Sequence, residues 1–213
     1  MANFKGHLAF GMATALAWSG IVAYLSILQP VFLPIIFIVT VLGSFLPDLD
    51  SDNGIPLRIL LILTSVIAGF YVGYFSYQKF TDNSILNAGL YALGSALFNY
   101  FVVGGFFKKI TVHRGMFHSI PAAVLSFLIT LTILSFCINL FDRRLILSLS
   151  VGIGYLCHLI LDELNSVVNL RGIPFIPNKS LGTALKFFSK NRLINILIYM
   201  LILILFIYNI PFK

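Results

Sequence analysis

Charged side chains are scarce in this chain. Asp, Glu, Lys and Arg make up 10% of its 213 residues, whereas hydrophobic residues make up 59% and the mean hydropathy is +1.00. A soluble domain has about 25% charged and about 45–50% apolar residues, and a globule of this length cannot bury so much apolar surface. The composition therefore excludes a soluble enzyme and a disordered segment, and it indicates a protein that spans a membrane several times.

Cysteine is also scarce, and its placement excludes a thiol-based framework. Cys137 and Cys157 both lie in apolar runs and form no CxxC pair. Two isolated thiols provide neither a disulfide scaffold nor a structural site of zinc thiolates. The sequence contains no GxSxG element, P-loop or dinucleotide fingerprint. Any chemistry must therefore come from other residues.

Long apolar stretches predict the fold. Seven of them approach the ~20 residues that cross a hydrocarbon core. They cover approximately residues 8–28, 31–46, 57–77, 84–107, 119–140, 145–161 and 193–210. Helices are expected because open sheet edges cannot be left in lipid. We predict an all-α, polytopic transmembrane bundle with about seven membrane segments, in which residues 1–213 form a single membrane-embedded domain.

Basic residues are distributed unevenly between the two sides of this bundle. With the loops placed alternately, the side of the N-terminus holds ten Lys and Arg residues and the other side holds four. The positive-inside rule then places the N-terminal side in the cytoplasm. On that side, the segment 162–192 combines basic and apolar residues, as in Lys186-Phe187-Phe188, and we expect its latter half to lie on the anionic membrane surface.

The histidines and most of the acidic residues are predicted to gather at this cytoplasmic end. They are His7, His113, His118 and His158, with Asp48, Asp50, Asp52, Asp162 and Glu163. Ionisable groups at membrane depth are costly and usually functional. We interpret the gathering as a candidate metal site.

His158 and Asp162 are the best-defined pair in this group. Their i, i+4 spacing places the imidazole and the carboxylate on one face of a helix, which suits two ligands of one metal ion. The alternative is a His–Asp hydrogen bond at a helix end. His7, which opens the first helix, is either a further ligand or an interfacial histidine.

An acidic turn follows the second apolar stretch. Asp48, Asp50 and Asp52 occupy alternate positions before Gly54. The spacing does not match a calcium-binding EF-hand, because Gly54 is one place late and Ile59 stands where a bidentate Glu is needed. We interpret these carboxylates as oxygen ligands delivered from a helix end; a solvated acidic turn is the alternative.

The segment His113-Arg114-Gly115-Met-Phe-His118-Ser119 carries the other two histidines. Five residues correspond to about 500° of helical rotation, so the two rings cannot share a regular helix face. Gly115 predicts a turn that brings both rings inward, and Ser119 with the following Pro121 predicts the start of the next helix. Arg114 is suited either to an anionic oxygen or to a lipid headgroup.

The number of candidate ligands exceeds the three or four protein ligands of one catalytic zinc ion. Mixed nitrogen and oxygen ligands suit Zn²⁺, Mn²⁺ or Fe. The surplus fits either two metal ions or one ion with carboxylates that orient its histidines. We predict one or two divalent ions, with Zn²⁺ first and Mn²⁺ as an alternative.

These elements, in this order, resemble the YdjM-like membrane-bound metal-dependent hydrolases of bacteria. The resemblance covers residues 1–190 and is most specific in the HRGxxHS element. It implies a multi-pass protein of the bacterial inner membrane, under LexA control in some members, with a distant similarity to zinc phospholipase C. The ligands that it implies are His7, Asp48, His118, His158 and Asp162, with Asp50 and His113 as further candidates. The Glu-Leu-Asn-Ser-Val sequence after Asp162 departs from the Thr- and Gly-rich pattern of many members, which affects the expected substrate contacts.

We therefore predict a metal-dependent hydrolase that acts at the cytoplasmic membrane face on a lipid-linked phosphoester or ester. Asp50, Asp52 or Glu163 would take a proton from the metal-activated water. Arg114 or Lys109 would stabilise developing negative charge. A membrane lipid or lipid-linked molecule is the expected partner, and no nucleic acid is expected, because the aromatic residues lie largely within spans. A divalent-cation transporter and a structural metal-binding scaffold are the alternatives.

Overall fold

The structure is a computed structural model that describes residues 4–50, 55–79, 85–106, 116–167, 184–189 and 191–210. Helices make up 86% of these residues, and no strand occurs among them. The prediction of an all-α protein is therefore confirmed.

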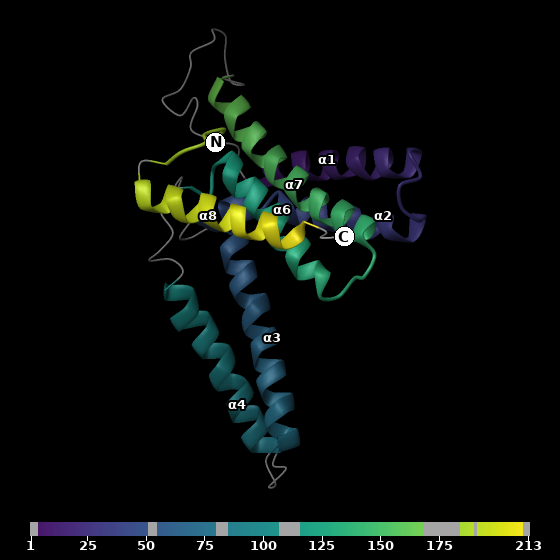
Figure 1. Cartoon of the computed structure of the whole chain (residues 1–213). Coiled ribbons are helices and arrows are strands. Elements are labelled where there is room, and N and C mark those ends of the chain that lie inside the picture. The colour runs from purple at the N-terminus through teal and green to yellow at the C-terminus, as the bar shows by residue number, and fades with distance from the viewer. Residues whose placement is uncertain are drawn as a thin grey trace. The chain divides into compact units, whose positions relative to one another are not determined.

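Each of the seven predicted apolar stretches overlaps one α-helix (Figure 1). The helices are α1 (Phe4–Tyr24), α2 (Leu33–Gly43), α3 (Ile55–Lys79), α4 (Ile85–Leu97), α6 (Ile120–Ser135), α7 (Phe141–Val167) and α8 (Arg192–Asn209). Two 3₁₀ turns, η1 (Pro30–Phe32) and η2 (Leu46–Asp50), flank α2, and a π-helical turn, Phe98–Val103, extends α4. Five helices are long and apolar enough to cross a membrane: α1, α3, extended α4, α7 and α8. Helices α2 and α6 have 11 and 16 residues and are shorter than a full span.

The chain divides into two compact units. The first contains Met1–Pro47 and Arg114–Lys213, and the second contains Asp48–His113. The first unit is thus built from helices α1, α2, α6, α7 and α8, and the second from the hairpin of α3 and α4.

Helix α7 is the central element of the first unit. Of its apolar window 67% is buried, against 22% for α1 and 0% for α8. One cluster of buried residues includes Val22 of α1, Ile36 of α2 and Leu147 of α7. A second cluster joins α6 and α7 near Leu159. Because α7 contacts α1, α2 and α6, residues on different sides of this helix reach different neighbours.

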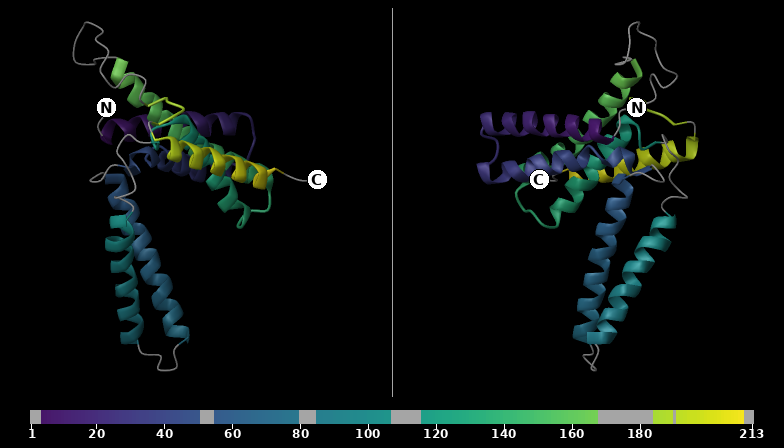
Figure 2. Two further views of the ribbon diagram at one scale, coloured as in Figure 1. Left: turned by 60° about the vertical axis from the view of Figure 1, so that its left-hand side comes forward. Right: turned by 180° about the vertical axis from the view of Figure 1, so that it is seen from behind.

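The second unit is a helical hairpin whose two helices run side by side in both views of Figure 2. A Cβ atom at Gly69 would lie 2.9 Å from the carbonyl oxygen of Ala92, so glycine permits the close approach of α3 and α4. Asn99, in the π-helical turn, accepts a hydrogen bond from the Thr64 hydroxyl of α3 at 3.1 Å. Small residues and several side-chain hydrogen bonds therefore hold this hairpin together.

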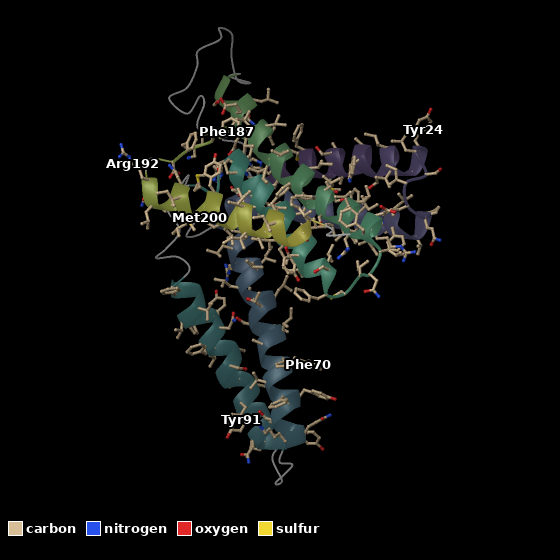
Figure 3. All side chains as sticks on the ribbon, viewed as in Figure 1. Tyr24, Phe70, Tyr91, Phe187, Arg192 and Met200 are labelled. Atoms are coloured by element: carbon tan, nitrogen blue, oxygen red, sulfur yellow. The ribbon has the colours of Figure 1, made fainter. Side chains whose placement is uncertain are left out.

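Large apolar side chains are exposed along the spanning helices. Phe70 is 77% exposed and Met200 is 55% exposed, and Figure 3 shows such side chains projecting from the ribbon. A soluble monomer rarely exposes large contiguous apolar patches. Exposed apolar side chains are expected on helices that are surrounded by lipid.

Helix α7 continues six residues beyond the apolar stretch from which it was predicted, which ended at residue 161. Asp162 and Glu163 are therefore helical rather than part of a non-spanning segment. The later part of the predicted segment 162–192 contacts α6 through Lys186, whose carbonyl accepts a hydrogen bond from the backbone N–H of Ile120 at 3.1 Å. Residues 168–183 lie outside the described part, and membrane-surface binding of this segment stays a prediction.

Candidate metal centre

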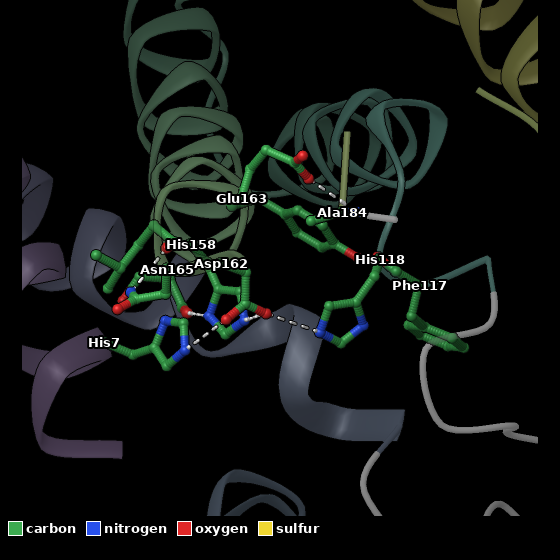
Figure 4. A network of polar contacts seen from close by, with 11 residues as sticks. His7, Phe117, His118, His158, Asp162, Glu163, Asn165 and Ala184 are labelled. Atoms are coloured by element: carbon green, nitrogen blue, oxygen red, sulfur yellow. Dashed lines mark hydrogen bonds and ion pairs between the residues drawn. The ribbon is translucent and has the colours of Figure 1, made fainter. Parts of the chain in front are cut away.

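Three histidines and one aspartate meet at one end of the first unit. They are His7 of α1, His118 immediately before α6, and His158 and Asp162 of α7, and each is between 1% and 6% exposed. Figure 4 shows the rings of His7 and His118 approaching the Asp162 carboxylate from two sides. Residues more than 100 positions apart in the chain therefore form one buried polar cluster, which consists of four of the residues singled out in the sequence.

Helix α7 delivers two of the four side chains. His158 and Asp162 are one turn apart, on the helix face that meets α2 and α1. One turn before His158, a Cβ atom at Gly154 would lie 2.0 Å from the carbonyl oxygen of Thr40. The absence of a side chain at Gly154 therefore lets α7 lie directly against the C-terminal end of α2.

This close approach also fixes the orientation of the His158 ring. Its Nδ1 lies 2.7 Å from the carbonyl oxygen of Ser44, the C-cap residue of α2. A carbonyl oxygen only accepts hydrogen bonds, so Nδ1 carries the hydrogen. The other nitrogen, Nε2, then presents its lone pair toward Asp162, which is how a neutral histidine binds a metal ion.

His118 is held at the entrance of α6. The Ser119 hydroxyl caps this helix by accepting from the backbone N–H of Ala122 at 3.3 Å, and Pro121 lies in the first turn. The helix start predicted from Ser119 and Pro121 is therefore confirmed. On the other side of His118, the Phe117 carbonyl accepts a hydrogen bond from the Tyr155 hydroxyl of α7.

His7 enters the cluster from the first turns of α1. Its ring stacks on that of His158, with centroids 3.8 Å apart and an angle of 11° between the planes. Among the residues that the structure describes, the buried Nδ1 of His7 has no hydrogen-bond partner. Buried polar atoms are normally paired, so burial of this nitrogen is costly for the protein.

The spacing of the donor atoms fits a metal ion better than hydrogen bonds. Asp162 Oδ1 lies 3.3 Å from His7 Nε2, and Asp162 Oδ2 lies 3.7 Å from both His118 Nε2 and His158 Nε2. Strong N–H···O bonds measure about 2.7–3.2 Å. Ligands held about 2.0–2.1 Å from a tetrahedral zinc ion are about 3.3–3.4 Å apart. The donor atoms of His118, His158 and Asp162 all lie within 4.8 Å of one another, so these three side chains could hold a divalent cation of the zinc type, with His7 Nε2 beside the same carboxylate.

The remaining predicted site residues are Asp48, Asp50, His113, Arg114 and Glu163. Asp48 lies in η2, directly after Pro47, as the first residue of the second unit. The side chain of Asp50 in the same turn, and all of His113 and Arg114, lie outside the described part. Glu163 of α7 accepts a hydrogen bond from the backbone N–H of Ala184 at 3.3 Å. Its carboxylate is thus anchored to the segment 184–189.

Two contacts of the cluster had no distinct signal in the sequence. The Ser44 carbonyl is a backbone group, and every residue has one. Tyr155 precedes His158 by three residues, so helical spacing alone placed it on the same side of α7, but nothing indicated Phe117 as its partner.

The fold and the cluster together define a class of protein: a helical membrane protein with a buried His–Asp centre. The chain belongs to the family described as YdjM inner membrane protein, whose sequence model matches residues 1–211. This match confirms the resemblance found in the sequence. No curated protein and no solved structure matches the chain.

Proposed function

We propose that this YdjM family member is a membrane-bound hydrolase that uses a divalent metal ion, with Zn²⁺ as the first candidate. The observation that carries the proposal is the spacing of 3.3–3.7 Å between the Asp162 carboxylate and three buried histidine nitrogens. Asp48 and His113 are proposed as additional ligands, and they would allow a second ion.

The chain's own residues provide a rigid and oriented donor set. A bound ion of this kind lowers the pKa of a coordinated water and polarises a substrate oxygen. His158 is fixed by Ser44, and His118 by the capped start of α6. The Asp162 carboxylate contributes negative charge in a place from which bulk water is excluded, so it favours a cation.

Other residues are proposed to handle the proton and the developing charge. Asp50 and Glu163 are the carboxylates proposed to take the proton from the attacking water. Arg114 is proposed to stabilise negative charge on the substrate. These assignments come from the sequence, and each can be separated from metal binding by substitution.

The substrate is proposed to be a lipid-linked phosphoester or ester at the cytoplasmic face of the inner membrane. His7 lies in the first turns of α1, and His118 directly precedes α6, so the centre is near helix ends rather than at mid-span. The excess of basic residues on the N-terminal side supports a cytoplasmic orientation and an anionic substrate. A lipid-linked molecule reaches such a position without leaving the membrane.

A transporter is less well supported. A transport path needs ionisable residues near the middle of its helices. In the described parts of the chain, α4 and α6 contain no ionisable Asp, Glu, Lys, Arg or His, and α8 contains only Arg192 at its start. The polar groups instead gather at one end of the first unit.

The test is to measure metal content and hydrolysis on the same detergent-purified protein. The wild type should hold at least one divalent ion and hydrolyse members of a panel of generic phosphodiester, phosphomonoester and ester substrates in mixed micelles. Asp162→Asn should lose both properties. The matched control is Asp142→Asn, which changes the same residue type in the first turn of the same helix and should retain both.

The outcomes separate the alternatives. Full metal content and activity in folded Asp162→Asn protein contradict the proposed centre. A wild type that holds metal but hydrolyses none of the panel, and that unfolds when the metal is removed, supports a structural metal instead. Asp50→Asn, Glu163→Gln and Arg114→Ala should keep the metal, and the variant that removes the general base should lose about 10²–10⁴-fold in rate.

A further inference from the structure

Tyr155 connects α7 to the turn that carries His118. Its hydroxyl donates a hydrogen bond to the carbonyl of Phe117, the residue directly before His118. The side chain is 2% exposed and packs in the buried cluster of Ala122, Ala123 and Leu159. A buried tyrosine hydroxyl needs a partner, and here the partner belongs to the backbone of a predicted metal ligand.

The accepting carbonyl controls the position of His118 through covalent geometry. The Phe117 carbonyl and the His118 nitrogen belong to one planar peptide unit. A hydrogen bond that holds this carbonyl therefore fixes the plane from which the His118 Cα and side chain extend. On the other side of His118, the Ser119 cap fixes the start of α6. The imidazole is thus held between two backbone anchors.

The spacing along α7 places Tyr155 on the same side of the helix as the two donors that α7 contributes to the cluster. Tyr155 precedes His158 by three residues and Asp162 by seven, and positions at such intervals lie along one side of a helix. One helix therefore supplies two donors directly and sets the position of a third. A small shift of the Phe117 peptide would change the separation of 3.7 Å between His118 Nε2 and Asp162 Oδ2.

We propose that Tyr155 is a positioning residue of the metal centre, which orients His118 through the Phe117 carbonyl. The inference rests on the proposed metal site, but not on the identity of the substrate. Tyr155 contacts neither the metal nor the substrate; its effect is on the geometry in which His118 meets the ion.

The experiment compares Tyr155→Phe with Tyr199→Phe in the full-length protein. Tyr199 makes the same kind of bond in the first unit, because its hydroxyl donates to the carbonyl of Phe187 at 3.0 Å. Metal-free proteins are titrated with Co²⁺, and both the affinity and the visible absorption spectrum are recorded, since the spectrum reports the coordination geometry. Loss of an outer hydrogen bond to a ligand typically costs about 10–100-fold in metal affinity.

We expect Tyr155→Phe to weaken Co²⁺ binding by about that factor and to change the spectrum, while Tyr199→Phe leaves both as in the wild type. An unchanged affinity and spectrum in Tyr155→Phe overturns this inference alone. A wild type that binds no Co²⁺ overturns the proposed function and this inference with it. If circular dichroism shows that Tyr155→Phe is unfolded at the titration temperature, the titration is repeated at a lower temperature at which this variant is folded, and a wild-type affinity and spectrum there overturn the inference.

Discussion

His158 Nδ1 and the carbonyl oxygen of Ser44 lie 2.7 Å apart, although the two residues are 114 positions apart in the chain. The contact determines which ring nitrogen faces Asp162, so the packing of α7 on the end of α2 contributes to the geometry of the candidate metal centre. Gly154 makes this packing possible, since any Cβ there would meet the carbonyl of Thr40. Helix packing and ligand orientation are therefore coupled.

The first prediction follows from this coupling. Gly154→Ala would place a methyl group 2.0 Å from the Thr40 carbonyl oxygen, so α7 must move away from α2. Overpacking typically costs about 1–3 kcal/mol, more than the gain of about 1 kcal/mol in helix propensity. We expect a lower melting temperature and a weaker affinity for Zn²⁺, measured by thermal unfolding in detergent and by metal titration.

Gly152→Ala is the control for this prediction. The residue is in the same helix, and a Cβ atom there would lie 3.4 Å from the Cβ of Phe127, which is an ordinary contact. We expect stability and affinity equal to or above those of the wild type. If the Gly154 and Gly152 variants had the same melting temperature and the same Zn²⁺ affinity, the close approach of α7 and α2 at Gly154 would not be needed for the metal site.

The second prediction concerns removal of the metal. An ion that binds only the folded protein stabilises it by about 2.7 kcal/mol at a free concentration of 100 times its Kd. For a chain of this size each kcal/mol corresponds to about 2–4 °C, so chelation should lower the melting temperature by about 5–10 °C. Asp162→Asn should melt at the same temperature with and without the chelator. A wild type whose melting is insensitive to both chelator and added Zn²⁺ contradicts the prediction.

The third prediction concerns the cap that precedes α6. The Ser119 hydroxyl donates to the Met116 carbonyl and accepts from the Ala122 N–H. Replacing such a cap by Ala typically costs about 0.5–2 kcal/mol, and here it also loosens the residue after His118. We expect Ser119→Ala to lower both the melting temperature and the Zn²⁺ affinity, and Ser119→Thr to restore them in part.

Ser126→Ala tests whether the effect belongs to the cap. Ser126 is in the interior of α6, and its hydroxyl donates to the Ala123 carbonyl at 2.8 Å. This bond duplicates one that the helix already makes, so its loss should change stability little and metal affinity not at all. A fall in affinity equal to that of Ser119→Ala would show that the cap has no special connection with His118.

Helical spacing explains which parts of the site were predictable. The pair His158 and Asp162 could be predicted to share a face because an i, i+4 relation is local. The start of α6 was predictable for the same reason, since Ser119 and Pro121 signal a helix start within a few residues. Convergence of His7 and His118 on that pair was inferred from topology, because alternate spans bring their ends to the same side.

Non-local and backbone contacts were not predictable. The Ser44 carbonyl has no residue-specific signal, and its role depends on how α2 and α7 pack. The end of α7 was placed too early because hydropathy detects the apolar window and not the helix. Asp162 and Glu163 end the apolar run, yet the backbone continues as a helix to Val167, since charged residues are acceptable in a helix that leaves the apolar layer.

The fourth prediction separates the packing and ligand roles of His7. His7→Phe keeps an aromatic ring against His158, with which His7 stacks at 3.8 Å, but it removes both ring nitrogens. We expect metal affinity to fall strongly while the metal-free protein remains as stable as the wild type or becomes more stable, because a buried nitrogen without a described partner is eliminated. Metal titration and thermal unfolding in chelator measure the two effects independently.

The neighbouring aromatic pair of α1 provides the control for this last change. Phe4 stacks on Phe45 with centroids 5.3 Å apart, close to His7 along the same helix but without a nitrogen. Phe4→Leu should reduce the stability of the metal-free protein through lost packing and leave the affinity for Zn²⁺ unchanged. His7→Phe is therefore expected to lower the metal affinity without lowering the stability of the metal-free protein, and Phe4→Leu is expected to do the reverse. Full metal affinity in folded His7→Phe would remove His7 from the set of ligands and leave His118, His158 and Asp162 as the donors that the ion requires.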